Sequence, residues 1–573
     1  MERVLFAPRG LPPLPADAAQ DLRRYDAWVR ARERTRVAGA RRRGHPKLGL
    51  ILIVGDGPAV AVRRTLTSLR GQRNARWSLS VVAPHSRLDD VSSVVRAIVP
   101  WRKRHACRLI GVPDGAPARD SLVRALAQHV DDTVGLLFPG DAWAPDAVAL
   151  LGAAVTPDGA AYADEDIVGD GGDHVAPRLK PDHSPDLHLS TAFVGRPLVF
   201  GVGLARHLSD LVADDMASLE HECALIVCRA ARRVRHLPEV LCHRSVPPEA
   251  PSGDAYLSRF VGSEPAPATV VPGRWPGTFH VGRDISPGTT VSVIVPFRDQ
   301  PRFLRTCVDS VRATAGGLVR LELVLIDNGT TDPETQTLVE RLAGQTGVQV
   351  VRDDRPFNWA QLNNAGARAA AGDVLLFLNN DIEARRAGWL EALCAHALRP
   401  GVGAVGARLL YPDGRLQHCG VVVGLGGAAG HPLAGLPGDE SGYLHMAAAT
   451  RECSAVTGAC LATRRDLFDE LGGFDETLGV DLNDVDFCLR AATKGFRTVY
   501  EPDAELIHYE SPSRGTAGGV GDIVHFIERW KDYIERRDPY LNVHLTRADP
   551  SCRLADDHEE EQWNRWFSTT KAG

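Results

Sequence analysis

Uninterrupted apolar runs followed at once by polar residues mark the predicted strands of this chain. Residues 374–378, Val-Leu-Leu-Phe-Leu, form such a run, and Asn379, Asn380 and Asp381 follow it directly. Five apolar residues in succession predict a strand buried on both faces. The polar triplet then lies at the carboxyl end of that strand, where open α/β sheets bind ligands. Its oxygens suit Mg²⁺ or Mn²⁺, although such a triplet is also typical of a plain turn.

The same pattern occurs a second time, nearer the start of the chain. Residues 134–141 repeat the apolar run, and Asp141 stands where Asp381 stands. Further along each copy, residues 236–243 parallel residues 500–508, and both segments end in histidine. The sequence therefore predicts two copies of one domain, the second lengthened within the Gly-rich segment 420–442.

In the second copy, strand-like and helix-like patterns alternate from residue 291 onward. A strand is predicted over residues 291–296, and another over residues 321–326 leads into Asp327. Alternation of this kind predicts a parallel sheet with right-handed crossovers. Asp327 and Asp381 are then expected at the same edge, which strengthens the metal and phosphate interpretation.

Composition divides the chain into five parts. The first is rich in Pro and Arg and contains a predicted helix from Ala18 to about Arg36, and the part between the two copies is rich in Pro and Gly. We expect the arm to pack on the body of the protein, with attraction to anionic lipid head groups, a peripheral membrane contact, as the alternative. The predicted parts are an arm (1–46), a first domain (47–245), a linker (246–288), a second domain (289–545) and a polar acidic tail (546–573).

Bulk properties exclude several classes of protein. A hydrophobic share of 44% and a charged share of 24% are typical of a globular protein, and the net charge of −6 gives no reason to expect nucleic-acid binding. The 11 cysteines lack CxxC spacing, which argues against a disulfide framework and a cysteine zinc site. No apolar run reaches the length of a signal peptide core or a membrane span, so we expect a cytoplasmic protein.

Eight short stretches of the second copy stand in a distinctive order and spacing. They are residues 291–296, 327–329, 357–364, 378–381, 455–460, 472–475, 483–490 and 508–511. Together they resemble the motif series of family 2 glycosyltransferases, which are inverting enzymes that use nucleotide sugars. The most similar subgroup is the tandem-domain enzymes of bacterial O-antigen, capsule and surface-polysaccharide assembly, many of them described as rhamnosyltransferases. The resemblance implies an α/β protein with two tandem GT-A domains, which are Rossmann-like nucleotide-diphospho-sugar transferase folds.

The resemblance also implies a metal site and a catalytic base. Mn²⁺ or Mg²⁺ is expected at Asp381, with Asn379 in its first shell or nearby, although the family triplet is usually Asp-x-Asp. His508 is expected either as a further metal ligand or as a hydrogen-bonded structural histidine. Asp484 is expected to take the proton of the acceptor hydroxyl, with Asp486 as the main alternative. Helix capping is the structural explanation for both aspartates.

Two further sets of residues follow from the same resemblance. The donor, linked to dTDP, UDP or GDP, is expected to contact Pro296, Phe297, Asp299, Asp327, Asn358, Asn363 and Asn380. The acceptor, a glycan or lipid-linked glycan, is expected at Gly458, Ala459, Phe474, Asp475, Asp486 and the loop around His431, although these could equally be packing turns. Residues 511–521 are expected to form a lid over the diphosphate.

The first copy departs from the pattern at the decisive positions. Its Asp-containing triplet is Pro139-Gly140-Asp141, and the position of Asp327 falls near His85. We therefore expect a degenerate first domain and a single active centre in the second. The alternatives are a two-centre glycosyltransferase and a non-catalytic glycan-binding scaffold; a sugar nucleotidyltransferase ranks last, because no Gly-rich, Lys/Arg-bearing amino-terminal loop is present.

Overall fold

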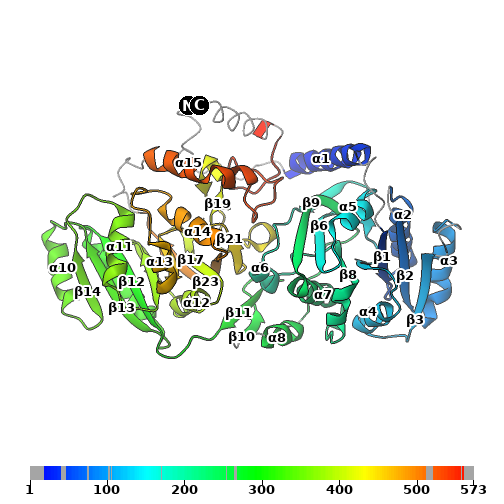
Figure 1. Cartoon of the computed structure of the whole chain (residues 1–573), viewed down its shortest axis with the longest axis horizontal. Helices are drawn as coiled ribbons and strands as arrows, with labels where there is room; N and C mark the ends of the chain where they lie inside the picture. Colours follow the sequence, from blue (N-terminus) through cyan, green and yellow to red (C-terminus); the bar gives the residue numbers. More distant parts are fainter. Residues whose placement is uncertain are drawn as a thin grey trace. The chain divides into compact units, whose positions relative to one another are not determined.

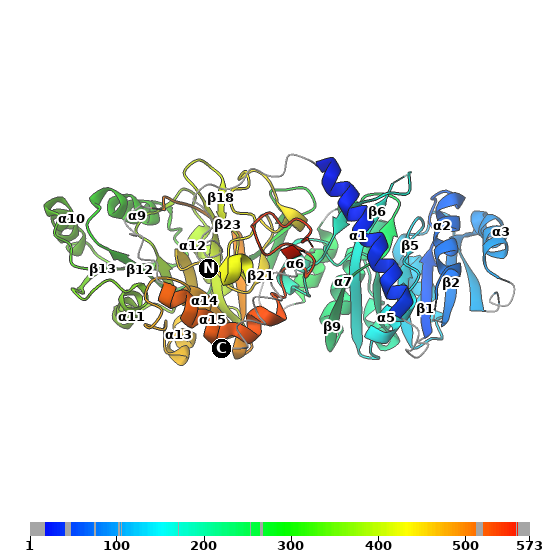
Figure 2. The same ribbon diagram turned by 90° about the horizontal axis from the view of Figure 1, so that it is seen from above.

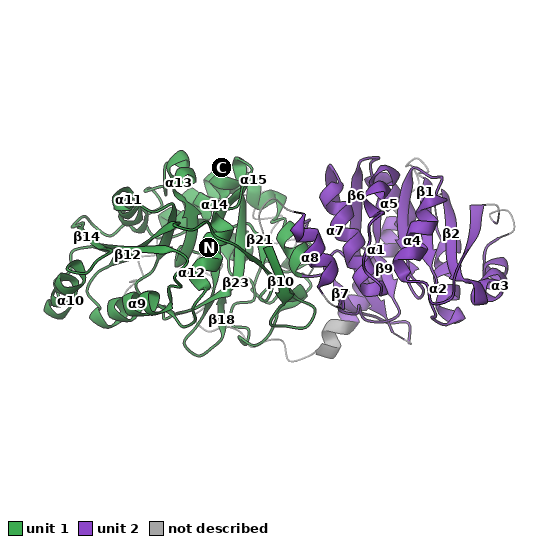
Figure 3. Ribbon diagram, turned by 90° about the horizontal axis from the view of Figure 1, so that it is seen from below, with its two compact units in different colours: residues 1–12, 184–190, 265–573 green, residues 13–183, 191–264 purple. Residues whose placement is uncertain are grey.

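The computed structural model describes most of the chain and divides it into two compact units (Figure 3). The described residues are 18–39, 47–73, 76–100, 104, 106–169, 171–252, 254–263, 268–510, 520–556 and 558–559. Of the described residues, one unit contains 18–183 and 191–263, and the other contains 184–190 and those from 268 onward. Each unit is built around one large sheet. We call the unit that contains residues 191–263 the first domain and the other unit the second domain.

The first domain has nine strands in one sheet. Its strands are β1 (Lys47–Ile53), β2 (Arg76–Pro84), β3 (Cys107–Val112), β4 (Thr133–Leu137), β5 (Ala142–Trp143), β6 (Gly159–Val168), β7 (His174–Arg178), β8 (Leu198–Gly201) and β9 (Arg233–Arg244). Its helices are α1 (Ala18–Gly39), α2 (Ala59–Arg70), α3 (Leu88–Ile98), α4 (Ala118–Ala127), α5 (Ala147–Ala154), α7 (Met216–Ala230) and α8 (Ala255–Gly262).

The second domain has ten strands in its main sheet and two small hairpins beside it. The main strands are β12 (Thr290–Phe297), β13 (Arg320–Asp327), β14 (Val348–Arg352), β15 (Val374–Leu378), β16 (Ile382–Ala384), β17 (Val402–Leu410), β18 (Leu416–His418), β21 (Arg451–Cys453), β22 (Cys460–Arg464) and β23 (Arg497–His508). The hairpin strands are β10 (Ala268–Pro272), β11 (Phe279–Arg283), β19 (Val422–Val423) and β20 (Ala429–Gly430). The helices are α6 (Pro185–Ser190), α9 (Pro301–Thr314), α10 (Pro333–Ala343), α11 (Trp359–Ala369), α12 (Trp389–Ala397), α13 (Arg465–Leu471), α14 (Asn483–Thr493) and α15 (Val520–Arg536).

The two main sheets have the same strand order, which confirms the predicted duplication. The first runs β3-β2-β1-β4-β8-β6-β9-β5 and the second β14-β13-β12-β15-β22-β17-β23-β16. The first four strands of each path are parallel, as predicted, but β22 is antiparallel to β15 and β16 is antiparallel to β23. In the first domain β8 is likewise antiparallel to β4, and β5 is antiparallel to β9. Each sheet is therefore mixed rather than purely parallel.

Helices cover both faces of the second sheet. Helices α9, α10 and α12 lie on one face, and α11, α13 and α14 lie on the other (Figures 2 and 3). The strands β15 and β17 are buried along their whole length, as expected for strands covered on both sides. The polar residues that follow these strands are therefore carried at fixed positions on the edge of a rigid core.

Helix α1 packs against the first domain, lying along its sheet (Figures 1 and 2). Tyr25 and Val29 of this helix are 2% and 0% exposed. Arg36 makes ion pairs with Asp146 and Glu239 at 3.1 and 2.8 Å. For its helical part, the arm thus packs on the body of the protein, in agreement with the first of the two interpretations of the sequence.

The predicted linker and the predicted tail both contain ordered structure within their described residues. The segment predicted as a linker includes α8 and the β10-β11 hairpin. In the segment predicted as a tail, Leu554 forms a bridge with Leu545, and Arg553 pairs with Asp549 at 3.1 Å. Within the described ranges, no helix combines the length and the apolarity that crossing a membrane would require.

Candidate active site

The carboxyl ends of three neighbouring strands bring polar residues together in the second domain. Strands β13, β12 and β15 are adjacent, and Phe297 pairs with Asp327 in register. Asp327 and Asp381 both follow buried runs and are 6% and 8% exposed. Both predicted carboxylates therefore lie at one edge, as the sequence indicated.

Asp381, Asn379 and His508 lie within contact distance of one another. Strand pairing brings them together, because Ile382 of β16 is the register partner of His508 at the end of β23. The Nε2 atom of His508 lies 3.2 Å from Oδ1 of Asp381 and 3.5 Å from the amide nitrogen of Asn379. A buried carboxylate and an imidazole nitrogen that face each other are a donor set suited to a divalent cation.

Gln417 holds the other side of the His508 ring. Its amide oxygen accepts a hydrogen bond from Nδ1 at 2.7 Å, which leaves the Nε2 lone pair facing Asp381. An imidazole fixed through its second nitrogen is typical of metal-binding histidines. The side-chain oxygen (Oδ1) of Asn379 instead accepts a hydrogen bond from the indole N–H of Trp359 at 3.2 Å. Asp381 and His508 thus fit a divalent cation directly, and Asn379 lies beside them.

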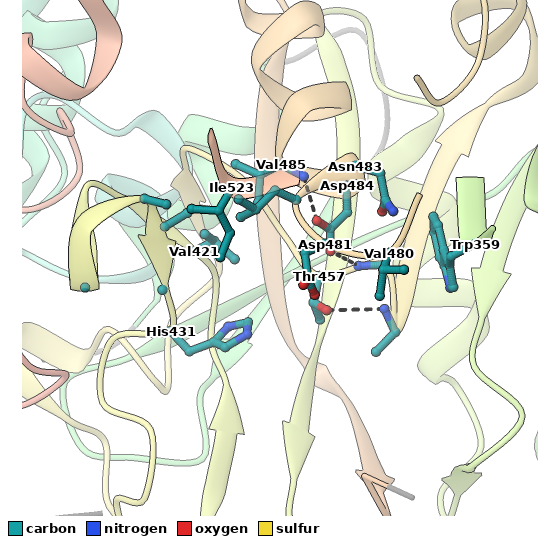
Figure 4. Close-up of a pocket in the computed structure, with 17 residues that line it drawn as sticks. Trp359, Val421, His431, Thr457, Val480, Asp481, Asn483, Asp484, Val485 and Ile523 are labelled. Carbon is teal, nitrogen blue, oxygen red and sulfur yellow. Dashed lines mark hydrogen bonds between the residues drawn. The ribbon is translucent and has the colours of Figure 1, made fainter. Parts of the chain in front are cut away.

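A cavity of about 360 Å³ lies beside this group in the second domain (Figure 4). Its apolar walls include Val421, Val480, Val485 and Ile523. Its polar and small residues include Trp359, Gly426, Gly430, His431, Thr457, Gly458, Ala459, Asp481, Asn483 and Asp484. The mixture of apolar walls with a few polar groups is typical of a small-molecule site.

Asp484 lies in the wall of this cavity, in the first turn of α14. Its Oδ2 atom accepts a hydrogen bond from the Gly458 N–H at 2.6 Å, and Oδ1 accepts one from the Val485 N–H at 2.7 Å. Both contacts and the helix terminus favour a negative charge on this carboxylate. A carboxylate in the wall of the cavity has the chemistry to accept a proton from a hydroxyl bound there.

The loop before β22 connects Asp484 with the candidate metal-binding group, which consists of Asp381, Asn379 and His508. Gly458 holds Asp484, and the carbonyl oxygen of the next residue, Ala459, accepts a hydrogen bond from the Asn379 N–H at 3.1 Å. Trp359 also connects the two, because it lines the cavity and donates a hydrogen bond to the side chain of Asn379. A Cβ atom at Gly458 would lie 2.7 Å from the Trp359 ring, so only glycine fits there.

His431 lines the cavity, and His418 packs behind it. The Nε2 atom of His418 accepts hydrogen bonds from the Gly420 and Thr457 N–H groups, each at 3.2 Å, and Nδ1 lies 2.9 Å from the Ala407 carbonyl. Burial holds the pKa of His418 well below its usual value. Burial also lowers the pKa of His431, whose ring contacts that of His418 and lines the cavity. The predicted loop around His431 thus presents a neutral imidazole to the cavity.

Most residues predicted to bind the donor lie at the sheet edge. Asp327 accepts hydrogen bonds from the Thr330 N–H at 2.8 Å and from Arg352 at 2.6 Å. Asp299 accepts hydrogen bonds from two backbone N–H groups, and Asn358 caps α11 through the Gln361 N–H. Pro296 and Phe297 end β12, and Asn380 is half-buried in the turn after β15.

The structure does not bring four predicted residues to the cavity. Asn363 is fully buried, and its amide donates to the Trp359 carbonyl, so it faces the interior instead of ribose or phosphate. Phe474 packs within an aromatic cluster, and Asp475 pairs with Arg529 at 2.6 Å. Asp486 is fully buried and pairs with Arg490 at 2.7 Å. The motif identified these residues, but their side chains support the fold.

Sequence reasoning missed three residues of the site. Trp359, Gln417 and Arg352 hold Asn379, His508 and Asp327 respectively. Trp359 could have been noticed, because it directly follows Asn358, a residue expected to contact the donor. Gln417 and Arg352 carry no comparable signal in the sequence. The predicted lid at 511–521 falls outside the described residues except for Val520 and Gly521.

The corresponding edge of the first domain is filled by an arginine. Asp141, the counterpart of Asp381, is 1% exposed and pairs with Arg196 at 2.9 Å. Arg196 also pairs with Glu220 at 2.6 Å, and Arg244 joins Glu220 to Glu165. Burial raises the pKa of Asp141, and Arg196 opposes that shift. A guanidinium therefore stands where a cation would have to bind.

Comparison with known proteins places the second domain in a family. Residues 292–472 match the profile described as "Glycosyl transferase family 2", and residues 431–567 match "Glycosyl transferase family group 2". The second domain is a family 2 glycosyltransferase domain. With the shared strand order, the chain consists of two tandem GT-A domains.

Several curated proteins are similar to this chain. It is 34% identical to the O-antigen biosynthesis protein RfbC of Myxococcus xanthus, over 97% of this chain and 45% of the relative. It is 29% identical to the N-acetylglucosaminyl-diphospho-decaprenol L-rhamnosyltransferase of Mycobacterium tuberculosis, over 34% of this chain and 68% of the relative. The chain thus spans about half the length of the first of these relatives.

Among solved structures, similarity to a mannosyltransferase of Pyrobaculum calidifontis in complex with GDP-Man and Mn²⁺ has a TM-score of 0.34. The two are 18% identical, over 55% of this chain and 86% of the other.

Replacing Gln417 with Leu should weaken binding of Mn²⁺ with a nucleoside diphosphate by about 10- to 100-fold, because His508 loses the partner that orients its ring. Calorimetric titration measures this affinity. Gln361→Leu, which removes an amide from α11 outside the candidate metal-binding group, should bind as the wild type does. Equal affinities for Gln417→Leu and the wild type would contradict the positioning role.

Replacing Arg196 with Met should destabilise the first domain by about 3 to 5 kcal/mol, because a buried carboxylate loses its counter-ion. The double variant Asp141→Leu/Arg196→Met should recover much of that loss. Hydrogen exchange of first-domain peptides in urea measures the effect separately from the second domain. Arg232→Met, at an exposed pair with Asp158, serves as a control that should change little.

Proposed function

We propose that the second domain transfers a sugar, with inversion, from a nucleoside-diphosphate donor to a hydroxyl of a glycan or lipid-linked glycan. The observation that carries this proposal is the position of Asp484. Its carboxylate lies in the wall of the cavity, and one loop joins it to Asn379 beside Asp381 and His508. The proposed proton acceptor and the proposed site of the cation that binds the diphosphate are then connected through one loop.

The proposed reaction is a direct displacement. The acceptor hydroxyl, bound in the cavity, gives its proton to Asp484 as its oxygen forms a bond to the anomeric carbon. The bond from that carbon to the diphosphate breaks, and its electron pair leaves with the nucleoside diphosphate. Mn²⁺ or Mg²⁺ held by Asp381 and His508 would stabilise the charge that develops on the diphosphate. Attack opposite to the leaving group inverts the anomeric configuration.

Nucleotide recognition is assigned to the edge formed by β12 and β13. Asp327 is held in place by Arg352 and by the Thr330 N–H, so its carboxylate is oriented before a ligand binds. Its oxygens can accept a hydrogen bond from a pyrimidine imide or a guanine N–H. Pro296 and Phe297 would flank the base, and Asp299, Asn358 and Asn380 complete the same edge.

The proposed biological role is assembly of a bacterial surface polysaccharide. Similarity over 97% of this chain to a protein named for O-antigen biosynthesis supports that role. The similarity to a rhamnosyltransferase that acts on a diphospho-decaprenol substrate supports a lipid-linked acceptor. A second active centre in the first domain is disfavoured, because Arg196 occupies the position of the cation.

Replacing Asp484 with Asn should lower the rate of transfer by about 10²- to 10⁴-fold while the affinity for the donor stays unchanged, because only the proton acceptor is lost. The measurement combines product formation with calorimetric titration of the nucleotide. Asp481→Asn, at another carboxylate of the cavity wall, is the matched control and should retain most activity. Full activity of Asp484→Asn would rule out this residue as the base.

Replacing Asp381 with Asn should abolish the dependence of nucleotide binding on Mn²⁺, because the cation loses its only proposed carboxylate ligand. Calorimetric titrations with UDP, dTDP and GDP, each with and without Mn²⁺, test this and identify the donor class. The equivalent change in the first domain, Asp141→Asn, should leave nucleotide binding as in the wild type. Loss of binding in Asp141→Asn alone would move the active centre to the first domain.

A further inference from the structure

Three neighbouring strands of the first domain present a carboxylate and two imidazoles to one another. Asp166 lies on β6, between His174 on β7 and His243 on β9. Strand register places them side by side, because Asp166 is paired with His243, and Val168 of the same strand is paired with His174. The three side chains are almost completely buried, so their positions are set by the sheet and not by a loop.

The ligand atoms of these residues converge. The Nδ1 atoms of His174 and His243 lie 2.8 and 2.6 Å from the two oxygens of Asp166. One atom from each residue can be chosen so that all lie within 4.8 Å of one another. A tetrahedral zinc ion with bonds of about 2 Å separates its ligand atoms by roughly 3.3 Å. Displacements of about half an ångström would therefore admit an ion, within the reach of ordinary side-chain rotation.

The surroundings orient these groups as the neighbours of a metal site usually do. The Nε2 atom of His243 lies 3.1 Å from a carboxylate oxygen of Glu33 on α1. The hydroxyl of Tyr25, also on α1, donates to Asp166 at 3.0 Å. A carboxylate on the outer nitrogen of an imidazole and a hydrogen bond to the carboxylate ligand are the typical outer-shell contacts of a zinc centre.

We propose that Asp166, His174 and His243 bind a zinc ion in the first domain. Two imidazoles and one carboxylate suit a borderline-soft cation better than Mg²⁺ or Ca²⁺, which prefer oxygen ligands. The site is distinct from the cation site assigned to Asp381 and His508 in the second domain. Glu33 and Tyr25 would link the bound ion to α1 and fasten that helix to the sheet.

The experiment uses the full-length chain, freed of metal by a chelator and dialysed. Titration with ZnCl₂, followed by calorimetry and by metal analysis after desalting, should show about one tightly held equivalent. Co²⁺ in place of zinc should give visible absorption bands of intensity typical of tetrahedral coordination. His174→Gln and His243→Gln should each lose the tightly held ion and the cobalt spectrum.

Control variants separate this site from the others in the chain. Asp381→Asn removes the ligand proposed for the glycosyltransferase centre, and His280→Gln alters a second cluster of His280, Glu501 and Asp503. Both should retain the zinc and the cobalt spectrum. Absence of tight binding to the wild type, or binding that survives both His174→Gln and His243→Gln, would overturn the proposal. Loss of the zinc in Asp381→Asn alone would also overturn it, because the bound zinc would then lie in the second domain.

Discussion

The carboxyl edge of each sheet is governed by the need of buried polar groups for partners. Asp381 and Asp141 are both carried on the end of a buried strand, where an unpaired charge would be costly. In the second domain Asp381 faces the His508 imidazole and the side-chain amide of Asn379, a group of side chains suited to a divalent cation. In the first domain Arg196 supplies the opposite charge permanently. The partner of this aspartate is thus what differs between the two sheet edges.

The cavity depends on a segment that has no counterpart of similar length in the first domain. Between β17 and β22 the second domain contains β18 to β21, whereas between β6 and β8 the chain forms β7 and α6. This additional segment supplies Val421, Gly426, Gly430 and His431 to the wall opposite Asp484. The segment thus helps to enclose, beside Asp484, the space that we propose for the acceptor.

Local pattern was sufficient for the strands and for the residues that end them, because burial on both faces produces continuous apolar runs. It was insufficient for Gln417, which reaches His508 only after β18 has paired with β17. A motif also does not say which way a side chain points. Asp484 and Asp486 are two residues apart, so they lie about 200° apart around α14, and only one of them can face the cavity. Asp486 is the one that turns inward, to Arg490.

In the first domain, the histidine equivalent to His508 contacts a residue of α1 instead of Asp141. His243 and His508 are equivalent, since each lies at the end of a long strand and pairs with the short strand at the sheet edge. His508 faces Asp381, but His243 turns to Asp166 and Glu33 instead of Asp141. Arg196 already neutralises Asp141, and Glu33 of α1 provides His243 with a different carboxylate partner. Removing Arg196 alone would therefore expose a carboxylate without restoring the histidine.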